Sequence, residues 1–210
     1  NSSDIMQLGT VWLTEDYEMP GFSINKEDIV IDIGAHIGLF SLFASQYCKN
    51  GKIFSYEPIK ENYNILKENI EVNKIENIIS FNSAVSKQTN KLKIFINSDD
   101  SAHSIFESEK NFIEVDSTTI KSIFDKNKIE NCNLLKFDCE GAEYQIIESI
   151  PKEYFFKIKK MIIEYHLANE KPEMYKKLIE NLKNNSFEIK IKKLSDSMGM
   201  IYAINKTKFD

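Results

Sequence analysis

The sequence predicts an α/β fold in which a mostly parallel β-sheet is covered by helices on both faces. Two observations support this prediction. Short apolar runs rich in β-branched residues alternate with helix-like segments from residue 28 onward, and repeated β-α units of this kind form parallel sheets. The last two apolar runs are joined instead by the short polar turn "SDSMG", which predicts an antiparallel hairpin at the C-terminal end.

The first half of the chain contains the first β-α repeats. Strands are expected at 28–33, 52–57 and 78–85, helices at 37–48 and 59–72, and a further strand at 91–96 that pairs beside 78–85. In the second helix Tyr63, Leu66 and Ile70 recur at three- and four-residue spacing. Pro58 stands where the first turn of a helix tolerates proline. The polar segment 97–113 shows no clear periodicity.

The second half continues the alternation and ends in the hairpin. A helix is expected at 118–126, a strand at 133–137, a helix from about Ala142, a strand at 159–165, a helix at 172–184 and the two hairpin strands at 187–194 and 200–205. In such sheets, ligands bind beyond the carboxyl ends of the strands, near the point where the strand order reverses. Functional residues are therefore expected directly after the strands.

Length and composition indicate one globular domain over 1–210. The chain has 210 residues, 42% of them hydrophobic and 28% charged, and it contains no repeat or Pro/Gly-rich linker. We expect a ligand-binding core at 29–167, a helix and hairpin at 168–210, and an N-terminal segment at 1–28 that covers the substrate site. Because the chain begins with Asn1 and shows no signal-peptide pattern, we expect it to be part of a longer polypeptide.

Charge and cysteine content exclude several classes of partner. The net charge is −5 and the chain contains no arginine, so the bidentate cation that recognises guanine and phosphate is absent and nucleic acid is not expected as a partner. Three scattered cysteines form neither a disulfide framework nor a metal-binding spacing, which favours the reducing cytoplasm. The apolar stretches fall far short of the ~20 residues that span a bilayer, so no membrane span is expected.

The stretch "VIDIGAHIG" places Asp32, Gly34 and Gly38 between the first strand and its helix. Gly34 permits a positive φ and a close approach of a ligand to the backbone, while the helix N-terminus offers free N–H groups to an anionic group. The D-x-G-x-x-x-G pattern alone is weak, because an ordinary strand-to-helix turn has the same composition. His36 stands where the middle glycine of a dinucleotide fingerprint would be, which favours a nucleoside without pyrophosphate over NAD or FAD.

Further acids and a histidine follow the later strands. Glu57 ends the second strand, where an acid of a Rossmann-like sheet accepts hydrogen bonds from ribose hydroxyls. Asp138 comes at the end of the strand expected at 133–137, and Glu140 follows it in the turn. Glu143 stands near the first turn of the next helix, where the macrodipole favours an acid whatever the function. Their spacing matches no dedicated metal loop, so no metal site is expected and activity should survive chelation.

The strand expected at 159–165 ends in "IIEYH", which places Glu164 and His166 on the same side of the strand. An imidazole next to a carboxylate at a strand end is suited to remove a proton from a hydroxyl, with the acid orienting the base. A structural histidine is the alternative. His103, in the polar segment, is interpreted as a solvated loop residue.

The segments "VIDIGAHIGLFSLFAS", "GKIFSYEPIKENYNILKENI", "ISFNSAVS", "LLKFDCEGAE" and "KMIIEYH" occur in this order. Together they resemble the FkbM family of S-adenosylmethionine-dependent methyltransferases over about residues 29–167. The resemblance implies a class I methyltransferase fold, with a seven-stranded Rossmann-like sheet whose last strand is antiparallel. It also implies O-methylation, usually of a hydroxyl on a sugar, a glycan or a small specialised metabolite. Residues 29–167 would then form the cofactor-binding core, and 1–28 a lid over the acceptor site.

The resemblance assigns roles to the residues that match the family's motifs. The turn from Asp32 to Gly38, with Gly34, Ala35 and His36, would hold the methionine part of the cofactor. Glu57 would bind the ribose, and Asn82, Ser83 and Ala84 would lie along the adenine edge. Asp138 would face the amino-acid end of the cofactor or the acceptor, and the "E-x-H" ending of Glu164 and His166 matches the family's catalytic strand end.

Two positions depart from the family. His36 stands where the family usually has asparagine, and the role of this histidine is left open. Lys121 stands where the family usually has aspartate, and this change is expected to affect only the local capping of the helix. Three alternatives to O-methylation stay open: methyl transfer to nitrogen or carbon, a cofactor-binding module without catalysis, and a NAD-dependent oxidoreductase with a similar fold.

Overall fold

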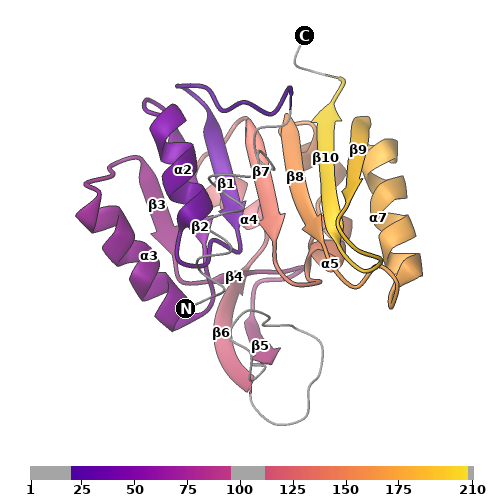
Figure 1. The fold of residues 1–210 in the computed structure, drawn as a ribbon, viewed down its shortest axis with the longest axis horizontal. Helices are drawn as coiled ribbons and strands as arrows, with labels where there is room; N and C mark the ends of the chain where they lie inside the picture. Colours follow the sequence, from indigo (N-terminus) through magenta and orange to yellow (C-terminus); the bar gives the residue numbers. More distant parts are fainter. Residues whose placement is uncertain (1–19, 96–111, 208–210) are drawn as a thin grey trace.

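A computed structural model describes residues 20–95 and 112–207 of the chain. Its main sheet has seven strands in the order β3-β2-β1-β7-β8-β10-β9 (Figure 1). These strands are β1 (Ile29–Ile33), β2 (Lys52–Tyr56), β3 (Ile78–Phe81), β7 (Leu134–Asp138), β8 (Lys160–Tyr165), β9 (Phe187–Lys193) and β10 (Gly199–Asn205). Neighbouring strands pair in parallel along β3-β2-β1-β7-β8, whereas β10 is antiparallel to both of its neighbours. The predicted sheet and C-terminal hairpin are confirmed.

Helices cover both faces of the sheet, as predicted. The helices are α2 (Leu39–Tyr47), α3 (Lys60–Val72), α4 (Ile120–Lys126), α5 (Glu143–Glu148), α6 (Lys152–Phe155) and α7 (Pro172–Asn184). In Figure 1, α2 and α3 lie in front of the sheet and α4 and α5 behind it. The alternation of side chains along β1 explains both layers, because Val30 belongs to the same hydrophobic cluster as Phe43 of α2 and Ile31 to the same cluster as Ile147 of α5.

The helix boundaries follow local chemistry. The α4 helix begins after Thr119, whose hydroxyl oxygen accepts a hydrogen bond of 3.1 Å from the backbone N–H of Ser122. The α7 helix begins at Pro172, as predicted. Pro58 lies one residue before Ile59, the N-cap of α3, so it precedes the first turn instead of standing in it. The short helix α6 was not predicted, because its four residues are too few to show a period.

The region 78–95 differs from the prediction of adjacent strands in one sheet. The run 78–85 is divided into β3 and β4 (Ala84–Val85), because the side-chain amide of Asn82 donates to the carbonyls of Glu57 and Pro58 and so fixes a turn. Strand β4 pairs in parallel with β6 (Phe112–Thr118), and β5 (Lys91–Phe95) pairs with β6 in antiparallel orientation. These strands form a second sheet of three, which projects from the carboxyl ends of β1 and β7 (Figure 1).

Part of the N-terminal segment 1–28 belongs to the core. Phe22 is buried against Tyr202 of β10, with ring centroids 5.5 Å apart. Residues 1–19 and 97–111, which contain most of the expected lid, most of the polar segment and His103, lie outside the described residues.

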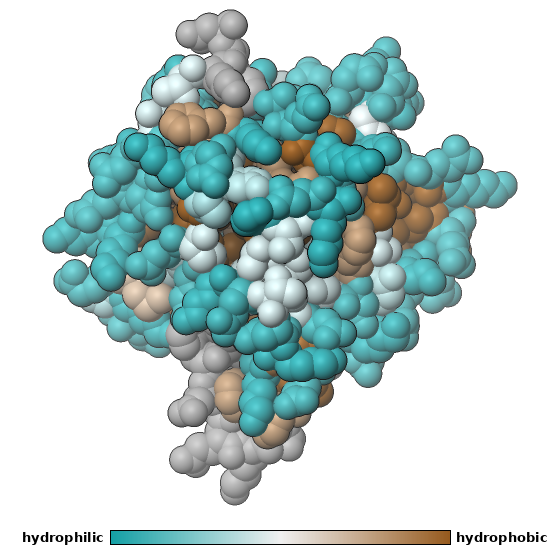
Figure 2. All heavy atoms as spheres, turned by 180° about the vertical axis from the view of Figure 1, so that it is seen from behind, coloured by the Kyte–Doolittle hydropathy of each residue, from teal (hydrophilic) through white to brown (hydrophobic). Residues whose placement is uncertain are grey.

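Hydrophilic residues dominate the face shown in Figure 2, and hydrophobic residues are visible mainly between them. Across 20–95 and 112–207, no helix combines the length and the apolar character that a membrane span requires.

Candidate active site

A cavity of about 110 Å³ opens at the carboxyl ends of β1, β2 and β7. Among the residues predicted to hold a cofactor, five line this cavity: Gly34, His36, Glu57, Ala84 and Asp138. The other five, Asp32, Ala35, Gly38, Asn82 and Ser83, do not line it. The strand ends therefore gather half of the predicted set around one cavity, as expected for a parallel sheet.

The turn after β1 lies directly against the end of β7. Gly34 has a φ of 75°, and a Cβ added there would lie 1.7 Å from the carbonyl oxygen of Asp138. At Gly38, the N-cap of α2 with a φ of 93°, an added Cβ would lie 2.3 Å from Leu66 Cδ1. The first glycine brings two strand ends together, and the second lets α2 pack against α3. Ala35 acts through its backbone, whose N–H donates to the carbonyl of Tyr56.

Glu57 is buried at the end of β2 and is fixed by the backbone. Its two carboxylate oxygens accept hydrogen bonds of 2.8 Å from the N–H groups of His36 and Ile59. Burial raises the pKa of Glu57 to about 7, against the lowering effect of these two donors. A carboxylate oxygen has more than one lone pair, so each can accept a further hydrogen bond from a ligand hydroxyl.

Apolar side chains also line the cavity. Ile59, Val85, Leu92 and Ile94 line it together with Ala84. Asn82 and Ser83 direct their side chains to backbone carbonyls: Asn82 bonds to Glu57 and Pro58, and Ser83 bonds to Asp116. These two residues therefore stabilise the backbone next to the cavity. A direct contact between them and adenine stays a prediction.

A buried ion pair lies beneath the turn. Lys136 Nζ lies 3.0 Å from Asp32 Oδ1 and donates to the carbonyl of Gly34 at 3.1 Å. Asp32 also accepts a hydrogen bond of 2.6 Å from the hydroxyl of Ser41. Asp32 is fully buried on the α2 side of the sheet, which explains why it does not reach the cavity. Sequence reasoning missed Lys136, although a lone lysine within the apolar run "LLKF" is a signal of this kind.

The acids after β7 have different environments. Burial raises the pKa of Asp138 to about 6, while Lys136, 3.8 Å away, opposes this shift. Burial also raises the pKa of Glu140 to about 7, against the opposing effect of His166. Glu143 is the first residue of α5, in agreement with its predicted place near the first turn, and it is fully buried.

Glu143 joins the β7–α5 turn to the end of β8. Its carboxylate accepts hydrogen bonds of 2.8 Å from the backbone N–H groups of Gly141 and His166. The hydroxyl of Tyr144 donates to the carbonyl of His166. This linkage explains why an acid is buried at that position, and it could not be read from the local spacing because its partner lies on another strand.

His166 lies among carboxylates. Its Nε2 is 3.7 Å from Glu140 Oε2 and 3.6 Å from Glu164 Oε1, and its Nδ1 is 3.7 Å from Glu143 Oε1. Burial lowers the pKa of His166, but Glu143, Glu164 and Glu140 outweigh this effect and raise it to about 11. The surrounding carboxylates therefore favour the charged imidazole, which is poorly suited to remove a proton from an acceptor. The predicted partners Glu164 and His166 are thus brought together, beside the cavity-lining Asp138 and Glu140.

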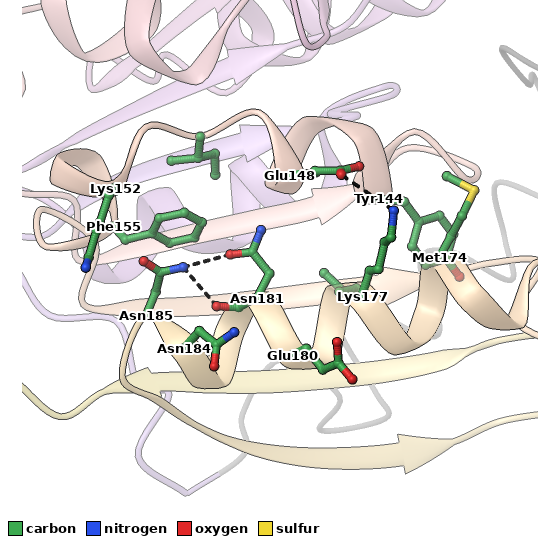
Figure 3. Close-up of a pocket in the computed structure, with 12 residues that line it drawn as sticks. Tyr144, Glu148, Lys152, Phe155, Met174, Lys177, Glu180, Asn181, Asn184 and Asn185 are labelled. Atoms are coloured by element: carbon green, nitrogen blue, oxygen red, sulfur yellow. Dashed lines mark hydrogen bonds and ion pairs between the residues drawn. The ribbon is translucent and has the colours of Figure 1, made fainter.

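A second cavity of about 480 Å³ lies between α5 and α7 (Figure 3). At the end of α7 the side-chain amide of Asn185 donates to the backbone and side-chain oxygens of Asn181, and Lys177 Nζ lies 4.0 Å from Glu148 Oε1. None of the residues predicted for the site lines this cavity. The smaller cavity at the strand ends is therefore the candidate active site.

Comparison with known proteins identifies the family. The model of the methyltransferase FkbM domain matches residues 32–189. The methyltransferase sdnD of Sordaria araneosa is 23% identical over 175 residues, which is 68% of each chain. The crystal structure of methyltransferase FkbM from Methylobacillus flagellatus superimposes with a TM-score of 0.62 at 14% identity, covering 93% of this chain and 47% of that one. The present chain thus spans about half the length of that protein.

A further solved structure shares the fold. Fibrillarin from Aeropyrum pernix, crystallised with natively bound S-adenosyl-L-methionine, has a TM-score of 0.54 at 15% identity and covers 86% of this chain and 67% of its own. The seven-stranded sheet with its antiparallel β10 is the class I methyltransferase fold. Because the family model covers most of the sheet and its strand-end residues, the chain belongs to the FkbM family of methyltransferases.

Proposed function

We propose that the protein binds S-adenosylmethionine in the cavity at the strand ends and transfers its methyl group to a hydroxyl of a small molecule, such as a sugar, a glycan end or a specialised metabolite. One observation carries this proposal: the buried acid Glu57, several apolar side chains and the acids Asp138 and Glu140 line the same cavity at the strand ends. The family membership and the fold shared with a structure that contains this cofactor support it.

The cavity residues fit the parts of this cofactor. The carboxylate of Glu57 is suited to ribose hydroxyls, and the wall formed by Ile59, Val85 and Ile94 is suited to adenine. Asp138 is suited to a positively charged group such as the sulfonium or the ammonium of the cofactor. The cavity is smaller than the ~300 Å³ typical of small-molecule sites, so the rest of the ligand would extend along the open strand ends.

Methyl transfer from a sulfonium is a displacement in which the acceptor oxygen, the methyl carbon and the sulfur must be in line. When bound, S-adenosylmethionine supplies the activated methyl group. The protein supplies orientation, which accounts for much of the rate in reactions of this kind. Glu164 and His166 lie 3.6 Å apart beside the cofactor cavity, where they are positioned to hold the acceptor hydroxyl. We assign the removal of its proton to the carboxylates of this cluster, with His166 positioning the acceptor.

Transfer of a deuterated methyl group tests this function. The protein is incubated with S-adenosylmethionine carrying a CD₃ group and a panel of sugars and hydroxylated metabolites, and products are located by mass spectrometry. We expect the label on oxygen. The His166→Gln variant should lower kcat by ~10²–10⁴ with unchanged cofactor affinity. A label on nitrogen or carbon would favour the alternative methyltransferases, and a variant with full turnover but a lower Tm would assign His166 a structural role.

A further inference from the structure

Three potential metal ligands meet at the ends of β7 and β8. Asp138, Glu140 and His166 each offer one ligand atom, and these atoms lie within 4.8 Å of one another. Glu164, the neighbour of Asp138 across the two strands, lies 3.6 Å from the imidazole. The local spacing of the acids gave no sign of a metal site, because the imidazole comes from a different strand.

The separations suit a cation between the ligands. Carboxylate oxygens and imidazole nitrogens bind divalent transition cations at ~2.0–2.2 Å, so opposite ligands of one ion lie ~4 Å apart and adjacent ligands ~3 Å apart. Nε2 of His166 lies 3.7 Å from Glu140 Oε2, which falls within this range. An ion would therefore require only small movements of the three side chains.

The imidazole of His166 provides a second, independent observation. His166 is only 8% exposed, and its buried Nδ1 has no hydrogen-bond partner among residues 20–95 and 112–207. Its Nε2 faces Glu140 and Glu164 at 3.6–3.7 Å, which is beyond the length of an N–H···O hydrogen bond. Buried polar groups in folded proteins are normally satisfied. Nε2 is the nitrogen that faces the acids, so a cation bound between them would give this nitrogen a close partner.

The surroundings of the ring match those of metal-bound histidines. A histidine that binds a metal through one nitrogen commonly directs the other toward a carboxylate. Nδ1 lies 3.7 Å from Glu143 Oε1, and Glu143 is itself fixed by the N–H groups of Gly141 and His166. The orientation of the ring toward the acids is therefore set by the backbone.

We propose that Asp138, Glu140 and His166 bind one divalent cation, with Glu164 beside it. The cation takes the place of the proton on Nε2, which is released to solvent when the ion binds. The mixture of oxygen and nitrogen ligands favours a first-row transition ion over Mg²⁺ or Ca²⁺, which prefer oxygen alone. Asp138 and Glu140 also line the cofactor cavity, so the ion would lie at the cavity mouth and hold the acceptor oxygen there. This role rests on the proposed function, whereas the binding of the ion does not.

Titration with Mn²⁺ alone, without cofactor or acceptor, tests the site. Electron paramagnetic resonance measures free Mn²⁺ as the protein is added, for the wild type and for Asp138→Asn, Glu140→Gln and His166→Gln. Glu148→Gln is the matched control, because Glu148 is an exposed acid on the neighbouring helix α5. We expect one saturable site in the wild type and the control, and an affinity at least tenfold weaker in each of the three variants.

Glu140→Gln decides the case if the other variants fold poorly, because its side chain is one-third exposed. Saturating Mn²⁺ should raise the Tm of the wild type and leave that of Glu140→Gln unchanged. The absence of saturable binding in the wild type, or equal binding by the wild type and a folded Glu140→Gln, would overturn the proposal. Binding of S-adenosylhomocysteine, measured separately, reports on the proposed function. A protein that binds this ligand and no Mn²⁺ refutes the cation site alone.

Discussion

Glu57 is a buried acid that lines the cavity at the strand ends. Its carboxylate is 4% exposed, lies within one cavity wall and is oriented by the N–H groups of His36 and Ile59. The charged groups Asp32 and Lys136 act on it from the neighbouring strands, Asp32 raising its pKa and Lys136 lowering it, but burial is the largest effect. The residue is thus held in one place while its charge depends on pH near neutrality.

The pH dependence of nucleoside binding should follow Glu57. In the protein without ligand, the pKa of the Glu57 carboxyl is raised to about 7. The carboxyl is therefore mostly protonated below this pH and mostly ionised above it. Ribose hydroxyls donate to the ionised form, so affinity should fall as the pH decreases from 8 to 6, by at most ~10-fold per unit. Calorimetry with adenosine, which lacks the amino-acid end near Asp138, measures this slope.

The Glu57→Gln variant is the matched control, because the amide keeps the shape but does not titrate. Its adenosine affinity should be lower and independent of pH between 6 and 8. An equal slope in the variant and the wild type would assign the titration to another group.

Some site residues could be predicted from the sequence and others could not. Gly34, Glu57 and Asp138 each follow an apolar run directly, so the strand-end rule identifies them. Lys136 was missed because its role depends on Asp32, which is its partner in the register of β1 and β7. The burial of Glu143 depends on His166, whose N–H it binds across the fold. Pairing between strands is not visible in local spacing.

At the scale of the elements, the sequence predicted the regular strands and helices better than the turns that follow a strand. The main sheet was predicted because its strands are short and apolar, with regular helices between them. The run 78–85 was predicted as one strand, since nothing in its hydrophobicity marks the turn that Asn82 fixes. Strand β6 was missed because its exposed and half-buried residues alternate along a polar sequence.

The turn between β1 and α2 should not tolerate a side chain at Gly34. An alanine there has to adopt a φ of 75° and to place its Cβ 1.7 Å from the backbone oxygen of Asp138. The positive φ costs ~1–2 kcal/mol, and the overlap should add ~1–3 kcal/mol because a backbone atom cannot move away easily. Urea denaturation of Gly34→Ala measures the loss of unfolding free energy.

Gly21 provides the comparison for this prediction. It has a similar φ of 91°, but the nearest atom to an added Cβ is a side-chain methyl of Ile204 at 3.5 Å. Gly21→Ala should therefore show only the cost of the positive φ. If the two variants lost the same unfolding free energy, the close approach of β1 and β7 would not be important for stability.

At the scale of the whole molecule, the parallel sheet brings distant residues to one edge. The carboxyl ends of β1, β2, β7 and β8 contribute a glycine turn, a buried acid, a pair of acids and a histidine. The sequence order of these elements was sufficient to predict the fold and the family resemblance. The larger cavity between α5 and α7 could not be anticipated, because it arises from the packing of two helices.

Calorimetric titration with S-adenosylhomocysteine, with NAD⁺ as the comparison ligand, tests the central claim most directly. The cavity at the strand ends should bind one S-adenosylhomocysteine per chain and show no measurable affinity for NAD⁺, because the dinucleotide fingerprint is interrupted at His36. Glu57→Ala should weaken binding by ~1–3 kcal/mol, the usual cost of losing hydrogen bonds to a charged group. Binding of NAD⁺ without S-adenosylhomocysteine, or an unchanged affinity in folded Glu57→Ala, would contradict the assignment of this cavity.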